Sequence, residues 1–162
     1  MPVPAGPSRL YCVTMLDDIY NRRVLTLAAS MSRLGRLAAP DASATAYSRL
    51  CGSTVTVDLK MANGVVTDFA HEVSACALGQ ASSSVMAGNV VGATVAELRA
   101  VRQQMRRMLK ENGTPPDGRF AELGALEMVR GYPARHASTM LTFDAVVDAL
   151  DQIEAALKPA AA

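Results

Sequence analysis

A change in the spacing of hydrophobic residues near the middle of the chain constrains the fold more than any other feature of the sequence. From residue 54 to residue 61, apolar and polar side chains alternate, a period of two that is typical of a half-buried β-strand. Asn63-Gly64 follows directly, and this pair favours a two-residue hairpin turn. We therefore predict a return strand over residues 65–72 and a third strand over residues 45–50, which together form an antiparallel meander.

Helical spacing of apolar residues is found on both sides of this meander. Before it, apolar residues recur at three- and four-residue intervals from Leu16 to Leu34, and Gly35 follows as a stop signal. After it, the same reasoning predicts helices that start near Cys76 and that cover residues 95–108, 123–129 and 138–157. A helix, a meander and then several helices predict an α+β fold, in which a small three-stranded antiparallel sheet packs against several helices.

The length of the chain, 162 residues, suits one compact domain, which we place at residues 16–157. Residues 1–15 are expected to form a flexible N-terminal tail, and residues 158–162 a C-terminal tail. The first residues lack the apolar run of a secretory signal peptide, and no stretch approaches the roughly 18–20 apolar residues of a membrane span. We therefore expect a cytoplasmic protein with no membrane partner.

The sequence contains three cysteines, Cys12, Cys51 and Cys76. An odd number in a protein expected to be cytoplasmic argues against a disulfide framework. Reduced cysteines of this kind are either small buried side chains or else metal ligands and nucleophiles. Cys12 lies before the predicted fold and is expected to have no role in the site, so the surroundings of Cys51 and Cys76 decide between these readings.

Three segments carry a resemblance to a known family. Cys51-Gly52-Ser53 precedes the alternating strand, residues 76–86 read Cys-Ala-Leu-Gly-Gln-Ala-Ser-Ser-Ser-Val-Met, and Tyr132-Pro133-Ala134-Arg135 precedes the last predicted helix. In this order, with one hairpin between the two cysteines, they resemble the IscU/NifU/SufU family of iron–sulfur cluster assembly scaffolds. The resemblance runs from about Ile19 to the last helix. It implies the U-type scaffold fold, with a cluster or zinc site at one tip of the sheet.

This sequence departs from the family at the implied site. The family has an aspartate at the position of Ser53, and its third cysteine falls on Ser138. A thiolate is a soft anionic ligand for zinc or iron, whereas a serine hydroxyl is hard and normally protonated. Closed zinc sites and common [2Fe–2S] clusters take four ligands, and Cys51 and Cys76 supply two. The site is therefore expected to be remodelled or discarded.

Other groups could complete the ligand set. His136 lies two residues before Ser138, and His71 lies near the end of the predicted return strand, so both could approach the same tip. A lone histidine is, however, more often an ordinary hydrogen-bonded residue of the surface or core than a ligand. Two chains could also pool their cysteines in a homodimer and offer four thiolates to one cluster.

The leading interpretation is a divergent scaffold or carrier protein for iron–sulfur cluster assembly, and not an enzyme. It would bind iron, an iron–sulfur cluster or zinc near Cys51 and Cys76, with His136 or Ser138 as further ligands. The implied partners are a cysteine desulfurase and acceptor apo-proteins. Two alternatives stay open: a metal-free degenerate scaffold fold that serves as an interaction module, and a persulfide acceptor in sulfur transfer. The second is weakened because relatives use the third cysteine in that exchange.

Basic residues gather on one face of the helix predicted over residues 95–108, namely Arg99, Arg102, Arg106, Arg107 and Lys110. Such a face would suit an acidic partner, but it is more often simply solvated. No aromatic stacking platform accompanies it, and the net charge of the chain is only +1, so we expect no nucleic-acid partner.

Overall fold

The structure is a computed structural model that describes residues 21–157. Its elements are α2 (Arg22–Ala29), β1 (Ala42–Tyr47), β2 (Thr54–Ala62), β3 (Val65–Ser74), α3 (Ala77–Asn89), α4 (Val95–Lys110), the 3₁₀ segments η1 (Gly118–Gly131) and η2 (Pro133–Arg135), and α5 (His136–Leu157). This content confirms the predicted α+β class. The two predicted tails, 1–15 and 158–162, and Cys12 lie outside the described residues. Between residues 21 and 157, no helix is both long enough and apolar enough to cross a bilayer.

The sheet is the predicted antiparallel meander, in the order β1-β2-β3. The turn between β2 and β3 is formed by Asn63 and Gly64, whose φ angles are 55° and 76°. Two consecutive residues with positive φ match the right-handed twist of the strands they join, which is why an Asn-Gly pair favours this turn. At the other end of the hairpin, Thr54 is paired with Ser74, so the start of β2 and the end of β3 meet at one tip.

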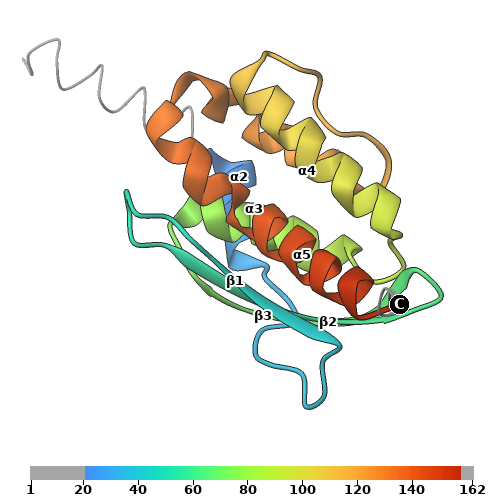
Figure 1. Cartoon of the computed structure of the whole chain (residues 1–162). Coiled ribbons are helices and arrows are strands. Elements are labelled where there is room, and N and C mark those ends of the chain that lie inside the picture. Colours follow the sequence, from blue (N-terminus) through green and yellow to red (C-terminus); the bar gives the residue numbers. More distant parts are fainter. Residues whose placement is uncertain (1–20, 158–162) are drawn as a thin grey trace, which may run out of the picture.

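Helices cover one face of the sheet (Figure 1). The helix α5 packs on β1 and β2, and α3 packs on β3 and on α5. The alternating residues Val55, Val57 and Leu59 of β2 are completely buried in this core. The helix α4 contacts α5 and η1, and it lies on the side of the helical layer that faces away from the sheet (Figure 1).

The predicted ends of two elements are wrong. The first helix ends at Ala29 instead of reaching Leu34, because residues 33–35 pair with the edge of β3: His71 N–H donates to the Arg33 carbonyl (3.1 Å) and Gly35 N–H to the His71 carbonyl (2.8 Å). The third strand covers Ala42–Tyr47 instead of residues 45–50. It ends early because the chain turns at Ser48, whose N–H donates to the Ser53 carbonyl (2.9 Å).

A buried carboxylate on β2 fixes the segment that follows α2. The Asp58 side chain is fully buried and accepts hydrogen bonds from Arg36 Nε (2.8 Å) and Nη2 (2.9 Å). It also accepts from the Leu37 N–H (2.9 Å) and from the Ser43 hydroxyl (2.6 Å). Burial raises the pKa of this carboxyl, but the hydrogen bonds outweigh burial, and the net pKa of Asp58 lies below its usual value.

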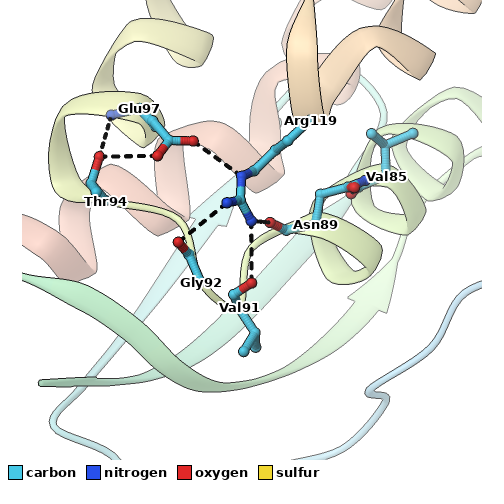
Figure 2. Close-up of polar contacts among 7 residues, drawn as sticks. All are labelled: Val85, Asn89, Val91, Gly92, Thr94, Glu97 and Arg119. Atoms are coloured by element: carbon cyan, nitrogen blue, oxygen red, sulfur yellow. Dashed lines mark hydrogen bonds and ion pairs between the residues drawn. The ribbon is translucent and has the colours of Figure 1, made fainter.

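A single arginine closes the turn between α3 and α4 (Figure 2). The Arg119 guanidinium donates to the backbone carbonyls of Asn89 (3.0 Å), Val91 (3.3 Å) and Gly92 (3.3 Å), and to the Glu97 carboxylate (3.0 Å). The last carbonyls of a helix have no partner within it, so Arg119 supplies what the end of α3 lacks. This contact also places η1 against the α3–α4 turn.

Candidate functional site

Cys51 lies in the turn between β1 and β2. Gly52 follows it with a φ of 69°, a left-handed conformation that glycine adopts without steric cost. The turn leaves Cys51 exposed, while its neighbour Ser53 is only 4% exposed. Cys51 Sγ lies 3.0 Å from Ser53 Oγ and donates to Ser48 Oγ at 3.5 Å.

These contacts favour the thiolate form of Cys51. The hydrogen bonds with Ser48 and Ser53 are the main reasons why the pKa of this thiol is lowered from its usual value, and the positive charge of Arg135 adds to the effect. Partial desolvation opposes them but does not prevail. An exposed thiol with a lowered pKa is both a better nucleophile and a better metal ligand than an ordinary cysteine.

Cys76 lies between β3 and α3, where it is the N-cap residue of the helix. Its side chain is partly buried, and Sγ donates to Ser138 Oγ at 3.6 Å. The Ser138 hydroxyl donates in turn to the Arg135 carbonyl (3.1 Å). The side chains of two residues that are 62 positions apart are therefore in contact at the first turns of α3 and α5.

A glycine in the first turn of α3 allows this close approach. A Cβ atom on Gly79 would lie 2.8 Å from the Ala75 Cβ and 3.0 Å from the Ser138 carbonyl oxygen. Both distances are shorter than ordinary van der Waals contact, so any larger residue would push α3 away from α5. The spacing of Cys76 and Ser138 therefore depends on Gly79.

The tip thus carries two cysteine–serine pairs, Cys51 with Ser53 and Cys76 with Ser138. The pairing of Thr54 with Ser74 joins the two strand ends, and Arg135 links the pairs, because its charge acts on Cys51 and its carbonyl binds Ser138. Chemically the tip offers two thiols and two hydroxyls. Within residues 21–157, no group of three or more cysteine, histidine, aspartate or glutamate side chains is arranged to hold a metal ion.

Both histidines bind backbone carbonyls. His136 is buried and its Nε2 lies 3.0 Å from the Val129 carbonyl and 3.3 Å from the Arg130 carbonyl, so this nitrogen faces η1. His71 is fully buried on β3 opposite Val57 of β2, with Nε2 2.8 Å from the Ser32 carbonyl. The expectation that His71 approaches the tip is wrong, because residues 32–35 run along the β3 edge and cover it.

Two residues of the tip were missing from the sequence prediction. Ser48 lies three residues before Cys51 and reaches it only because the chain turns there. Arg135 was noted as part of a motif, but its electrostatic effect on Cys51 depends on the fold. A serine or arginine close to a motif cysteine could have been proposed as a thiolate-stabilising group, although nothing local distinguishes it from other polar residues.

Comparison with known proteins gives the family. Residues 19–138 match the NifU-like N terminal domain. The iron–sulfur cluster assembly scaffold protein IscU of Thermotoga maritima is 26% identical over 135 residues, which cover 83% of this chain and 94% of that protein.

Solved structures agree with this match. The crystal structure of a nitrogen-fixing NifU-like protein (N-terminal) from Brucella abortus is 69% identical, with a TM-score of 0.86 over 87% of this chain and 98% of that one. A protein from Fervidobacterium islandicum, described as a scaffold for the SUF system, shares the fold at 20% identity, with a TM-score of 0.76 over 83% of this chain and 98% of that one. The matched residues include Cys51, Cys76 and Ser138, and the resemblance inferred from the motifs is confirmed. The chain belongs to the NifU-like N-terminal domain family.

Proposed function

We propose that this protein is a divergent scaffold or carrier in iron–sulfur cluster assembly, which holds iron, a cluster or zinc as cargo at the tip that contains Cys51 and Cys76. Family membership and the similarity to a protein described as an IscU scaffold support this role. In it, a cysteine desulfurase would supply sulfur and acceptor apo-proteins would take the assembled cargo.

The observation that carries the proposal is the spacing of Cys76 and Ser138. In a tetrahedral zinc site with Zn–S bonds of about 2.3 Å, neighbouring sulfur atoms lie about 3.8 Å apart. Cys76 Sγ and Ser138 Oγ lie 3.6 Å apart, so the backbone at the third-cysteine position already has the separation that two ligands of one metal ion need. This spacing supports the proposal that Cys76 and position 138 form a ligand pair in which one member has become a hydroxyl.

The number of thiols indicates how the cargo would be completed. One chain contributes Cys51 and Cys76, and a [2Fe–2S] cluster takes four protein ligands. Ser53 and Ser138 are weak ligands, so the stronger route to four thiolates is a second copy of the chain. Leu50 is 77% exposed and Tyr47 is 59% exposed beside Cys51, and a second copy could cover these apolar side chains.

Anaerobic reconstitution with iron and sulfide tests the proposal. We expect iron and visible absorption in the wild-type protein, loss of both in Cys51→Ser and in Cys76→Ser, and no change in the matched control Cys12→Ser. Native mass measurement of the loaded protein distinguishes one chain per cluster from two. Iron that survives both substitutions would show that the cargo binds elsewhere. Folded wild-type protein that takes up neither iron nor zinc would favour the metal-free interaction module.

A second candidate function, persulfide acceptance, is favoured by the lowered pKa and the exposure of Cys51. The Cys51 thiolate would attack the outer sulfur of a desulfurase persulfide. A new S–S bond would form on Cys51 as the desulfurase S–S bond breaks and its cysteine leaves as a thiolate. Persulfide labelling in the presence of a desulfurase tests this step. Label on Cys51 that survives Cys76→Ser supports it, and equal labelling of Cys51→Ser contradicts it.

A further inference from the structure

A basic cleft is lined by residues of α4 and α5. It has a volume of about 360 Å³ and is lined by Arg99, Arg102, Arg106, Arg107 and Glu111 near α4 and by Val147 of α5. The arginines share one face of α4, because their spacing of three and four residues repeats close to the helical turn. The opposite face of α4, which includes Val101, Met105 and Met108, is buried in the core.

The first half of this basic face is neutralised by α5. Arg99 Nη2 donates to Asp151 (2.7 Å) and to Glu154 (3.0 Å), and Arg102 Nε donates to Asp144 (2.8 Å). Later residues of α4 thus meet earlier residues of α5, so the two helices run antiparallel. Carboxylates on one face of α5 therefore form ion pairs with arginines of α4 where the two helices are in contact.

The second half of the basic face has no such match. Continuing the same register, Arg106, Arg107 and Lys110 lie alongside the first part of α5, and residues 136–143 contain no aspartate or glutamate. Arg106 and Arg107 are exposed, and neither forms an ion pair with any residue from 21 to 157. Glu111 is the one carboxylate that lines the cleft. A net positive charge therefore remains at the C-terminal end of α4.

We infer that this end of the cleft, where Arg106 and Arg107 carry no ion pair with the described residues, docks an acidic segment of a partner protein. The carboxylates of α5 already bind Arg99 and Arg102 in this way. A partner helix with carboxylates three and four residues apart would bind the arginines of α4 that α5 leaves unpaired. The helix α4 lies on the side of the helical layer that faces away from the sheet (Figure 1), so a partner bound to α4 would not need to contact β1, β2 or β3.

The chemistry of the cleft favours a protein segment over a phosphate group or a nucleic acid. Among residues 21–157, those that line the cleft include no aromatic side chain, so they offer no surface on which a base could stack. Val147, which also lines the cleft, offers an apolar contact that suits a peptide side chain.

Fluorescence anisotropy with a designed peptide tests the inference. The probe is a 20-residue helical peptide with glutamates three and four residues apart, and its control has glutamine at the same positions. We expect the glutamate peptide to bind the full chain, with an affinity that falls steeply as salt is raised, and the glutamine peptide to bind at least about tenfold more weakly. The variant Arg106→Gln/Arg107→Gln is expected to lose about tenfold in affinity at low salt.

The matched control is Arg22→Gln/Arg23→Gln, which removes two exposed arginines of α2 and changes the net charge equally. It is expected to bind the glutamate peptide as the wild type does, and circular dichroism verifies that both double variants are folded. Equal loss in both variants would overturn the inference, because the attraction would then be general to the charged protein. Displacement of the peptide by millimolar inorganic phosphate, or tighter binding of a DNA duplex, would also overturn it. Because iron loading is not part of the assay, its outcome is independent of the proposed cargo site.

Discussion

Restoring the two ligands that this tip lacks should produce a tight zinc site. The double variant Ser53→Asp/Ser138→Cys adds a carboxylate 3.0 Å from the Cys51 sulfur position and a thiol 3.6 Å from the Cys76 sulfur position, as judged from the present hydroxyl oxygens. The second distance is close to the roughly 3.8 Å edge of a tetrahedral thiolate site. The first is shorter, but an aspartate side chain is one bond longer than serine and can adjust.

The expected gain follows from the ligand count. Zinc binding to complete four-ligand sites is worth about 10–16 kcal/mol, which is roughly 2.5–4 kcal/mol for each ligand. Two added ligands should therefore increase zinc affinity by at least about a thousandfold, since each 1.4 kcal/mol is about a factor of ten. With zinc at about a thousand times its dissociation constant, the folded state gains about 4 kcal/mol, and the unfolding temperature should rise by roughly 10 °C.

Competition with a chromophoric chelator measures the affinity, and thermal unfolding with and without zinc measures the stabilisation. The control Ser53→Asn/Ser138→Ala changes the same positions without adding an anionic ligand, and it should bind zinc no better than the wild type. Adding Cys76→Ser to the double variant should abolish the gain. A folded Ser53→Asp/Ser138→Cys protein with wild-type zinc affinity would refute the view that the tip retains the geometry of a ligand set.

Further outcomes follow from particular contacts. Cys51 should react with iodoacetamide at pH 7 faster in the wild type than in Ser48→Ala/Ser53→Ala, because those hydroxyls lower its pKa; mass spectrometry of the labelled peptide measures the rates. Asp58→Ala should cost about 1–3 kcal/mol in urea unfolding, because it leaves the Leu37 N–H and the Ser43 hydroxyl without their acceptor. The pKa of Asp58 is lowered in the folded state, so ionised Asp58 stabilises the fold. This stabilisation is complete above the unfolded pKa of about 4 and is lost as the pH falls through the folded pKa. A pH series of urea melts should therefore show the unfolding free energies of the wild type and Asp58→Asn converging at acid pH. Arg119→Ala should cost about 1–2 kcal/mol by the same assay, because the last carbonyl of α3 and two carbonyls of the α3–α4 turn lose their donor. Gly79→Ala should destabilise the fold by about 1–3 kcal/mol through overpacking against Ala75 and Ser138, and an unchanged unfolding midpoint would mean that α3 can shift at no cost.

Local chemistry explains which parts of the fold could be predicted from the sequence. The alternation in β2 and the Asn63-Gly64 turn act between neighbouring residues, and both are found as predicted. The end of α2 depends instead on contacts far along the chain, namely the edge of β3 and the buried carboxylate of Asp58. No periodicity within residues 16–35 contains that information, so the helix was extended too far.

In the candidate site, too, some contacts could be predicted from the sequence and others depend on the fold. The contact between Cys76 and Ser138 could be anticipated from motif order, because the family resemblance assigned Ser138 to the third-cysteine position. The burial of His71 could not, since it results from residues 32–35 crossing the strand edge. The turning of His136 toward the carbonyls of η1 likewise depends on a 3₁₀ segment, where the sequence indicated a short helix of unspecified type.

The two serines also change how the tip behaves without cargo. A tip with three thiols and a carboxylate gathers groups that repel one another once they ionise, and a bound metal relieves that repulsion. Here each thiol instead faces a hydroxyl, and the buried hydroxyl of Ser138 is satisfied by the Arg135 carbonyl. Because a hydroxyl can donate to a thiolate or accept from a thiol, Ser53 can bind the Cys51 sulfur in either of its protonation states. If the proposed function is right, this tip would hold its cargo with fewer anionic ligands than a tip with three thiols and a carboxylate. Fewer anionic ligands would suit a protein that binds its cargo briefly and gives it up easily.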